Sequence, residues 1–127
     1  MEKRFYQGVS LLLILLGLSI FVTWGIRKIH EPAQMQLLEA SELALEEEPE
    51  QAISLARLAH SRWERTRTLT AAVADHAPMD DIDALFAEME VYAQAEELPH
   101  FSACCLQLSK LLRSMYEAHS FTWWNVV

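Results

Sequence analysis

The sequence predicts an all-α protein, an N-terminal transmembrane helix followed by a small antiparallel four-helix bundle. Two observations lead to this fold class. Gly8, Gly17 and Gly25 are the only glycines, so the rest of the chain lacks the residue on which strand–turn–strand connections depend. Alanine, leucine, glutamate, methionine and glutamine, which favour helices, dominate that part of the sequence.

Residues 8–26 form an apolar segment without a charged side chain. As a helix it would span about 28 Å, close to the ~30 Å hydrocarbon core of a bilayer. The apolar run is longer than that of a signal peptide, and no small-residue cleavage site follows it. We therefore expect three parts: an N-terminal flank (1–7), a retained anchor in the lipid bilayer (8–28) and an acidic helical domain with an aromatic C-terminal tail (29–127).

The orientation of the anchor is less strongly encoded. Lys3 and Arg4 precede the apolar segment and Arg27 and Lys28 follow it, so the positive-inside rule discriminates little. The short N-terminal flank and the signal-like start favour a cytoplasmic N-terminus. We expect a single-pass protein of the cell membrane with an extracytoplasmic domain.

The acidic domain carries six Lys or Arg and seventeen Asp or Glu residues, a net charge of −11. A nucleic-acid-binding surface requires a basic stripe, so nucleic acid is excluded as a partner. Prolines divide the domain into four segments that are each long enough for a helix, at about 33–47, 50–75, 80–97 and 101–119. Short connections favour antiparallel neighbours, hence the bundle. The apolar tail after His119 should pack on the bundle or dock on a partner.

Carboxylates crowd the start of the third segment, which could suggest acid–base catalysis. They are better explained as partners of the helix N-terminus and of arginines in the preceding segment. The sequence contains no nucleophile elbow and no glycine-rich phosphate loop. We predict neither enzymatic activity nor a cofactor.

Metal-ligating residues are sparse. The five histidines are widely separated, and no pair has the spacing that holds a metal on one helical face. His76 and His119 precede two breaks that could meet at one end of the bundle, so a candidate metal or ligand site comprises His76, Asp80 and His119. Adjacent Cys104 and Cys105 do not suit a disulfide, and we expect one buried and one partly exposed thiol.

The aromatic residues Trp63, Phe121, Trp123 and Trp124 lie outside the anchor. Large aromatic side chains pack in cores, but they are also enriched where proteins bind partners. Both roles remain open for these four residues.

Several stretches together resemble a catalogued family. They are the Lys-Arg-Phe start and the residues 29–32, 63–64, 74–92 and 119–125, of which the last ends in Trp-Trp-Asn. The chain is similar in nearly its whole length to domain of unknown function 4363, an uncharacterised bacterial family associated with Firmicutes. The resemblance implies a small membrane-anchored helical protein and supplies no catalytic residues.

We therefore expect a non-catalytic protein-interaction or scaffolding module at the membrane, with an unknown protein partner. The alternative is an extracytoplasmic helical bundle that senses a ligand or a metal.

Overall fold

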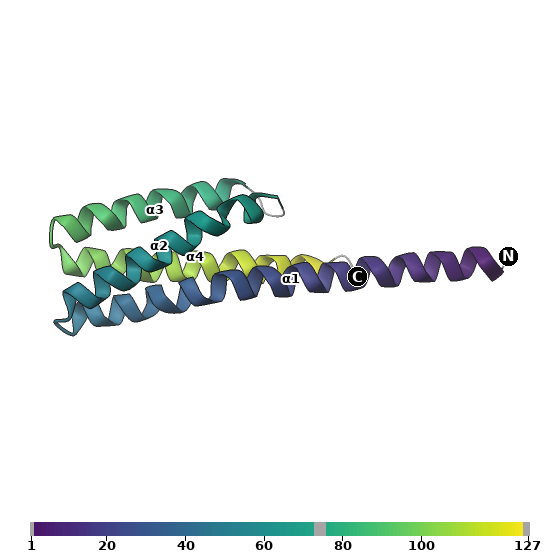
Figure 1. Ribbon diagram of the computed structural model, residues 1–127, viewed down its shortest axis with the longest axis horizontal. Helices are drawn as coiled ribbons and strands as arrows, with labels where there is room; N and C mark the ends of the chain where they lie inside the picture. The colour runs from purple at the N-terminus through teal and green to yellow at the C-terminus, as the bar shows by residue number, and fades with distance from the viewer. Residues whose placement is uncertain (1, 73–75, 126–127) are drawn as a thin grey trace.

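The computed structural model describes the backbone of residues 2–72 and 76–125, and their side chains except those at 76, 116 and 118–125. This part of the chain forms four α-helices: α1 (Glu2–Leu45), α2 (Pro49–Ala71), α3 (His76–Gln94) and α4 (Leu98–Asn125). Helix α1 packs against α2 and α4, while α3 packs against α4 and more loosely against α2 (Figure 1). Each helix is antiparallel to its neighbours, so the predicted all-α bundle is confirmed.

Helix α1 is longer than the sequence predicted. We expected a boundary at Pro32 and a bundle helix from Ala33, but one helix runs unbroken from Glu2 to Leu45. A proline cannot donate a hydrogen bond to the carbonyl four residues earlier, here that of Lys28. The helix continues because His30 and Ala33, on either side of Pro32, are both buried in the bundle.

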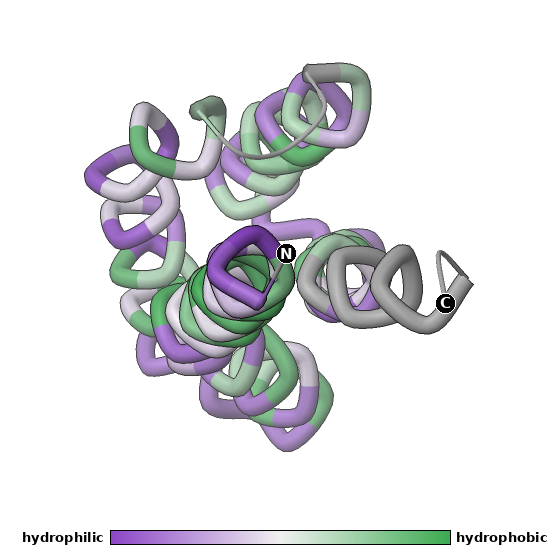
Figure 2. Tube along the Cα trace, turned by 90° about the vertical axis from the view of Figure 1, so that its right-hand side faces the viewer, coloured by the Kyte–Doolittle hydropathy of each residue, from purple (hydrophilic) through white to green (hydrophobic). Residues whose placement is uncertain are grey.

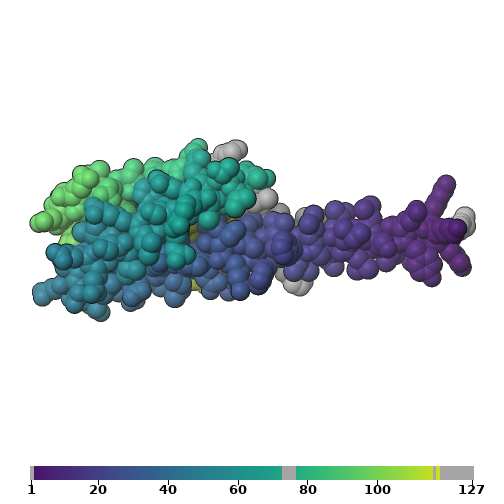
Figure 3. All heavy atoms as spheres, in the orientation of Figure 1, coloured from purple at the N-terminus to yellow at the C-terminus, as the bar shows by residue number. Residues whose placement is uncertain are grey.

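The N-terminal half of α1 projects from the bundle as a rod (Figure 3). Figure 2, viewed along the rod, shows a hydrophilic first turn at the N-terminus and mainly hydrophobic turns behind it. Only 6% of the most apolar 18-residue stretch of α1 is buried. Among the helices in the described ranges, α1 alone is long and apolar enough to cross a membrane.

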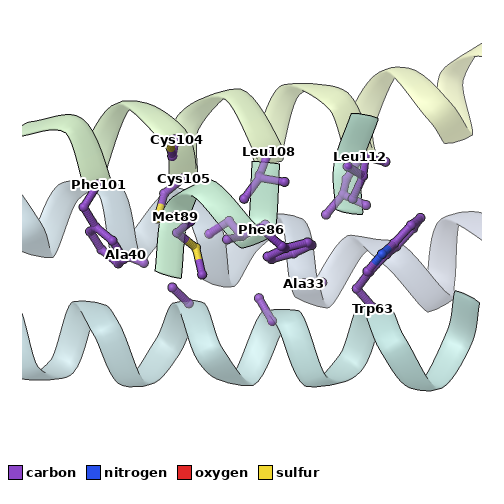
Figure 4. Packing of buried hydrophobic residues seen from close by; sticks show 14 of the residues in the cluster. Ala33, Ala40, Trp63, Phe86, Met89, Phe101, Cys104, Cys105, Leu108 and Leu112 are labelled. Carbon is purple, nitrogen blue, oxygen red and sulfur yellow. The ribbon is translucent and has the colours of Figure 1, made fainter. Parts of the chain in front are cut away.

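The core of the bundle is asymmetric. Helices α1 and α2 contribute mainly alanines, and α3 and α4 contribute large side chains such as Phe86, Met89 and Phe101 (Figure 4). Small side chains let two helix axes approach closely, and large side chains then fill the space opposite them. The buried alanines of α1 and α2 are Ala33, Ala40, Ala44, Ala52, Ala56 and Ala59.

Three prolines lie in the first turns of helices and do not end them. Pro49 begins α2, while Pro78 and Pro99 are the third and second residues of α3 and α4. The first N–H groups of a helix have no intrahelical acceptor, so a proline costs nothing there. For this reason α3 and α4 begin earlier than the predicted residues 80 and 101.

Helix α4 also extends further than predicted. We ended it at His119 and treated the remainder as a tail, whereas the helical backbone reaches Asn125. Neither glycine nor proline occurs between Pro99 and the end of the chain, so the sequence offers no residue that stops a helix.

The turns after α1 and α3 share one geometry. Glu47 and Glu96 have φ angles of 62° and 58°, in the left-handed region. The next residue in each turn donates a backbone hydrogen bond five residues back, from Glu48 to Leu43 (3.2 Å) and from Glu97 to Tyr92 (3.0 Å). This is the Schellman ending, in which glycine normally occupies the left-handed position.

Replacing the strained residue should stabilise the bundle. We expect Glu96→Gly to raise the free energy of unfolding by about 0.5–1 kcal/mol, since the left-handed conformation costs a side-chain-bearing residue about 1–2 kcal/mol and glycine loses some entropy in return. Chemical denaturation of the full chain in detergent micelles, followed by circular dichroism, measures the change. The control Ala87→Gly, at an exposed position in the middle of α3, should instead destabilise, and a loss of stability in Glu96→Gly would contradict the prediction.

Candidate functional site

A buried polar cluster lies where α1 enters the bundle. The Nε2 atom of His30 lies 2.9 Å from the hydroxyl oxygen of Thr70, and that hydroxyl donates to the carbonyl of Thr66 at 2.9 Å. The hydroxyl must therefore accept from His30, whose Nε2 carries the proton. Burial lowers the pKa of His30 to about 4, so the imidazole is neutral at pH 7. The cluster locks α1 to α2.

Trp63 closes the same region from α2. Its side chain is completely buried, and its ring lies 5.6 Å from that of His30 between centroids. The indole Nε1 donates to Asp83 Oδ1 on α3 at 2.6 Å, while Asp83 Oδ2 accepts from Arg67 Nε at 2.8 Å. Trp63 is thus a core residue that ties α2 to α3. This corrects its place among the candidate partner contacts, because no surface remains on it to touch a partner.

The carboxylates of α3 pair with arginines of α2, as the sequence predicted. Arg57 donates to both oxygens of Glu90, at 2.7 and 3.3 Å, and the hydrogen bonds lower the pKa of Glu90. Arg67 also lies 3.7 Å from Asp80. Such exposed pairs stabilise a fold by about 0–1 kcal/mol each. They hold α3 beside α2 and form no acid–base pair within a cavity.

Histidines in the described part of the chain have structural partners. His60 stacks on Phe86 with ring centroids 4.5 Å apart, and its Nε2 lies 3.2 Å from Glu64. Among the described residues no group of three or more His, Cys, Asp or Glu side chains could hold a metal. The side chains of His76 and His119 lie outside the described residues, so the candidate site that they form with Asp80 stays a prediction.

Both cysteines are buried, which corrects the expectation that one of the two thiols is partly exposed. Cys104 and Cys105 occupy adjacent positions on α4, and both fit because α3 packs over this part of the helix. Burial raises the pKa of both thiols, that of Cys105 to about 12. A thiol of this kind is neutral at pH 7 and unreactive.

An open groove runs between α1 and α2 on the outside of the bundle. Its lining residues are Glu39, Leu43, Glu50, Gln51, Ser54, Leu55 and Leu58. Three leucines form the apolar part, and carboxylates from both helices flank it. This groove was not predicted from the sequence, because helical periodicity predicts buried stripes and not which partly exposed leucines of two helices meet.

The remaining candidate partner contacts are Phe121, Trp123 and Trp124. Their side chains lie outside the described residues, but their backbone forms the last turns of α4. Core packing and partner binding both stay predictions for these three residues.

Truncating Trp63 should unfold the bundle. Trp63→Ala removes a fully buried ring and leaves Asp83 without its indole donor, so we expect a loss of about 3–5 kcal/mol in the free energy of unfolding. The matched control Leu69→Ala alters a side chain of α2 that is 65% exposed and should change stability by less than about 0.5 kcal/mol. Denaturant titration of both variants in micelles provides the comparison, and similar stabilities would refute a core role for Trp63.

Acid should destabilise the bundle through His30. Its pKa lies near 4 in the folded state against 6.5 when exposed, so the unfolded chain binds more protons between these values. The contribution of neutral His30 to the free energy of unfolding is complete above pH 6.5. It falls by about 2 kcal/mol on going from pH 7 to pH 5, and it is gone below pH 4.

The test compares denaturant titrations at pH 7 and pH 5 for the unaltered chain and for His30→Gln, which removes the titrating group. The loss of stability on acidification should be about 2 kcal/mol smaller in the variant. An equal pH dependence of the two proteins would contradict the prediction.

Comparison with known protein families yields one match. A family model described as Domain of unknown function (DUF4363) matches residues 20–126. No curated protein and no solved structure matches the chain. The match begins within the apolar half of α1 and includes all of α2, α3 and α4. The chain therefore belongs to the family of domain of unknown function 4363.

Proposed function

We propose that this protein is a non-catalytic interaction or scaffolding module, anchored in the cell membrane by the apolar half of α1. The observation that carries the proposal is the continuity of α1, because one rigid helix contains both the apolar segment and the first helix of the bundle. With residues 8–26 in the bilayer, the remaining length of α1 holds the far end of the bundle about 28 Å from the membrane surface. We also propose an extracytoplasmic position for the bundle, because basic residues followed directly by an apolar segment resemble a secretory signal.

The groove between α1 and α2 is the surface that we propose for the partner. Its leucines supply apolar contact, and Leu58 is 43% exposed. Glu39 and Glu50 flank the groove, and the bundle as a whole is strongly acidic. A complementary partner is an amphipathic segment with lysines or arginines beside its apolar face.

The alternative, a ligand- or metal-sensing bundle, has less support. It rests on His76, Asp80 and His119, and Asp80 already pairs with Arg67 across α2 and α3.

Site-specific photo-cross-linking in intact cells tests the proposed partner surface. A benzophenone amino acid replaces Leu58 in the groove, and in a control it replaces Val91 on α3, which is 63% exposed. We expect a specific adduct from position 58 only, whose cross-linked peptide carries lysine or arginine. The adduct should disappear when Glu39→Lys and Glu50→Lys reverse the charge of the rim.

Adducts of equal yield from both positions, or an adduct insensitive to the charge reversal, would contradict the proposed surface. An adduct of twice the mass of the chain would show that a second copy of the protein, not a different partner, occupies the groove.

A further inference from the structure

The register between α1 and α4 fixes what lies beside the apolar segment. Gln34 contacts Ser109 at 3.5 Å, and Ser102 donates to the carbonyl of Ser41 at 2.8 Å. Seven residues forward along α1 thus correspond to seven residues back along α4. Continued in the other direction, the same register brings Glu117 level with Ile26, and the end of α4 at Asn125 level with Leu18. The last turns of α4 therefore run beside the apolar half of α1.

The charged residues of both helices stop at the same level. Followed from the bundle toward the N-terminus, α1 has its last charge before the apolar segment at Arg27, which pairs with Glu31 at 3.6 Å. On α4 the last charge is Glu117, which pairs with Arg113 at 2.8 Å. Beyond this belt of two ion pairs, residues 8–26 and 118–125 contain no Asp, Glu, Lys or Arg.

Burial along α1 agrees with this register. Leu16, Ser19, Val22 and Thr23 are half-buried and recur every three or four residues, so one face of the apolar segment is covered. Residues 8–15, beyond the reach of α4, are all exposed.

Helices α2 and α3 do not reach this level. The contact of Thr70 with His30 places the end of α2 near the start of the bundle, and Figure 1 shows α2 and α3 ending short of the last turns of α4. Among the described elements, α1 is the only neighbour of residues 118–125. One neighbouring helix covers only one side of another. The remaining sides of residues 118–125 therefore face the same medium, water or lipid, that surrounds the apolar segment of α1.

We propose that residues 118–125 of α4 enter the lipid bilayer beside α1, as a second membrane contact whose partner is the lipid of one leaflet. The inference rests on the proposed membrane placement of the apolar segment. If that segment spans the hydrocarbon, α4 reaches about 12 Å below the belt of ion pairs, past the headgroups. Phe121, Trp123 and Trp124 fall within this stretch, level with Val22, Ile20 and Ser19 of the apolar segment, and large aromatic residues suit the acyl region that this depth implies.

Quenching of tryptophan fluorescence by brominated phospholipids tests the inference on the full chain in vesicles. Trp63 is retained in every variant as the buried reference. The first variant keeps Trp24 as well (Trp123→Phe, Trp124→Phe), the second keeps Trp124 (Trp24→Phe, Trp123→Phe), and the third keeps Trp63 alone. Circular dichroism verifies that each variant remains helical.

We expect brominated lipid to remove much of the emission contributed by Trp124 and by Trp24, and little of that from Trp63. If Trp24 is quenched while Trp124 is quenched only by aqueous iodide, or by neither agent, the second membrane contact is wrong and the anchor stands. If brominated lipid quenches neither Trp24 nor Trp124, the membrane placement of α1 itself is wrong, and the inference fails with it.

Discussion

The arrangement of this protein depends on α1 remaining helical through Pro32. A proline inside a helix costs about 3 kcal/mol or more, through a lost hydrogen bond and a steric clash. The bundle opposes that cost on both sides of the residue: His30 bonds to Thr70, and Ala33 and Leu37 are buried, where a leucine side chain contributes about 1.5–3 kcal/mol. A break at Pro32 would turn a rigid connection between the apolar rod and the bundle into a hinge.

The two halves of α1 suit two different solvents, and their sequences differ accordingly. Residues 8–15 are all exposed and almost all apolar, a composition that suits the interior of a bilayer. From Ile26 onward one face is buried, and it carries small residues that admit α2 at close range. Large side chains from α3 and α4 then complete the core, so each hairpin supplies what the other lacks.

The sequence predicted the fold class, the number of bundle helices and the ion pairs between α2 and α3, because composition and charge spacing determine these directly. It did not predict where α3 and α4 begin, since a proline reads as a break from sequence although its effect depends on whether it lies in a first turn, as Pro78 and Pro99 do. Nor could it decide the role of Trp63. Burial of that ring depends on Asp83, twenty residues away, being level with it across α2 and α3. The groove was missed for the same reason, because it exists only where two helices meet.

A second contact with the bilayer would change what the groove can bind. A single membrane helix leaves its soluble domain free to tilt, whereas two helices entering the same leaflet side by side restrict the tilt to directions that keep both embedded. The groove between α1 and α2 runs along α1, so a segment lying in it would also stand upright on the membrane. The α1 residues that line the groove, Glu39 and Leu43, lie about 18–24 Å beyond Arg27 along the helix. That geometry suits a helix that continues over this distance from the anchor of another membrane protein and so arrives in the same direction. A soluble protein must instead lose all of its orientational freedom on binding.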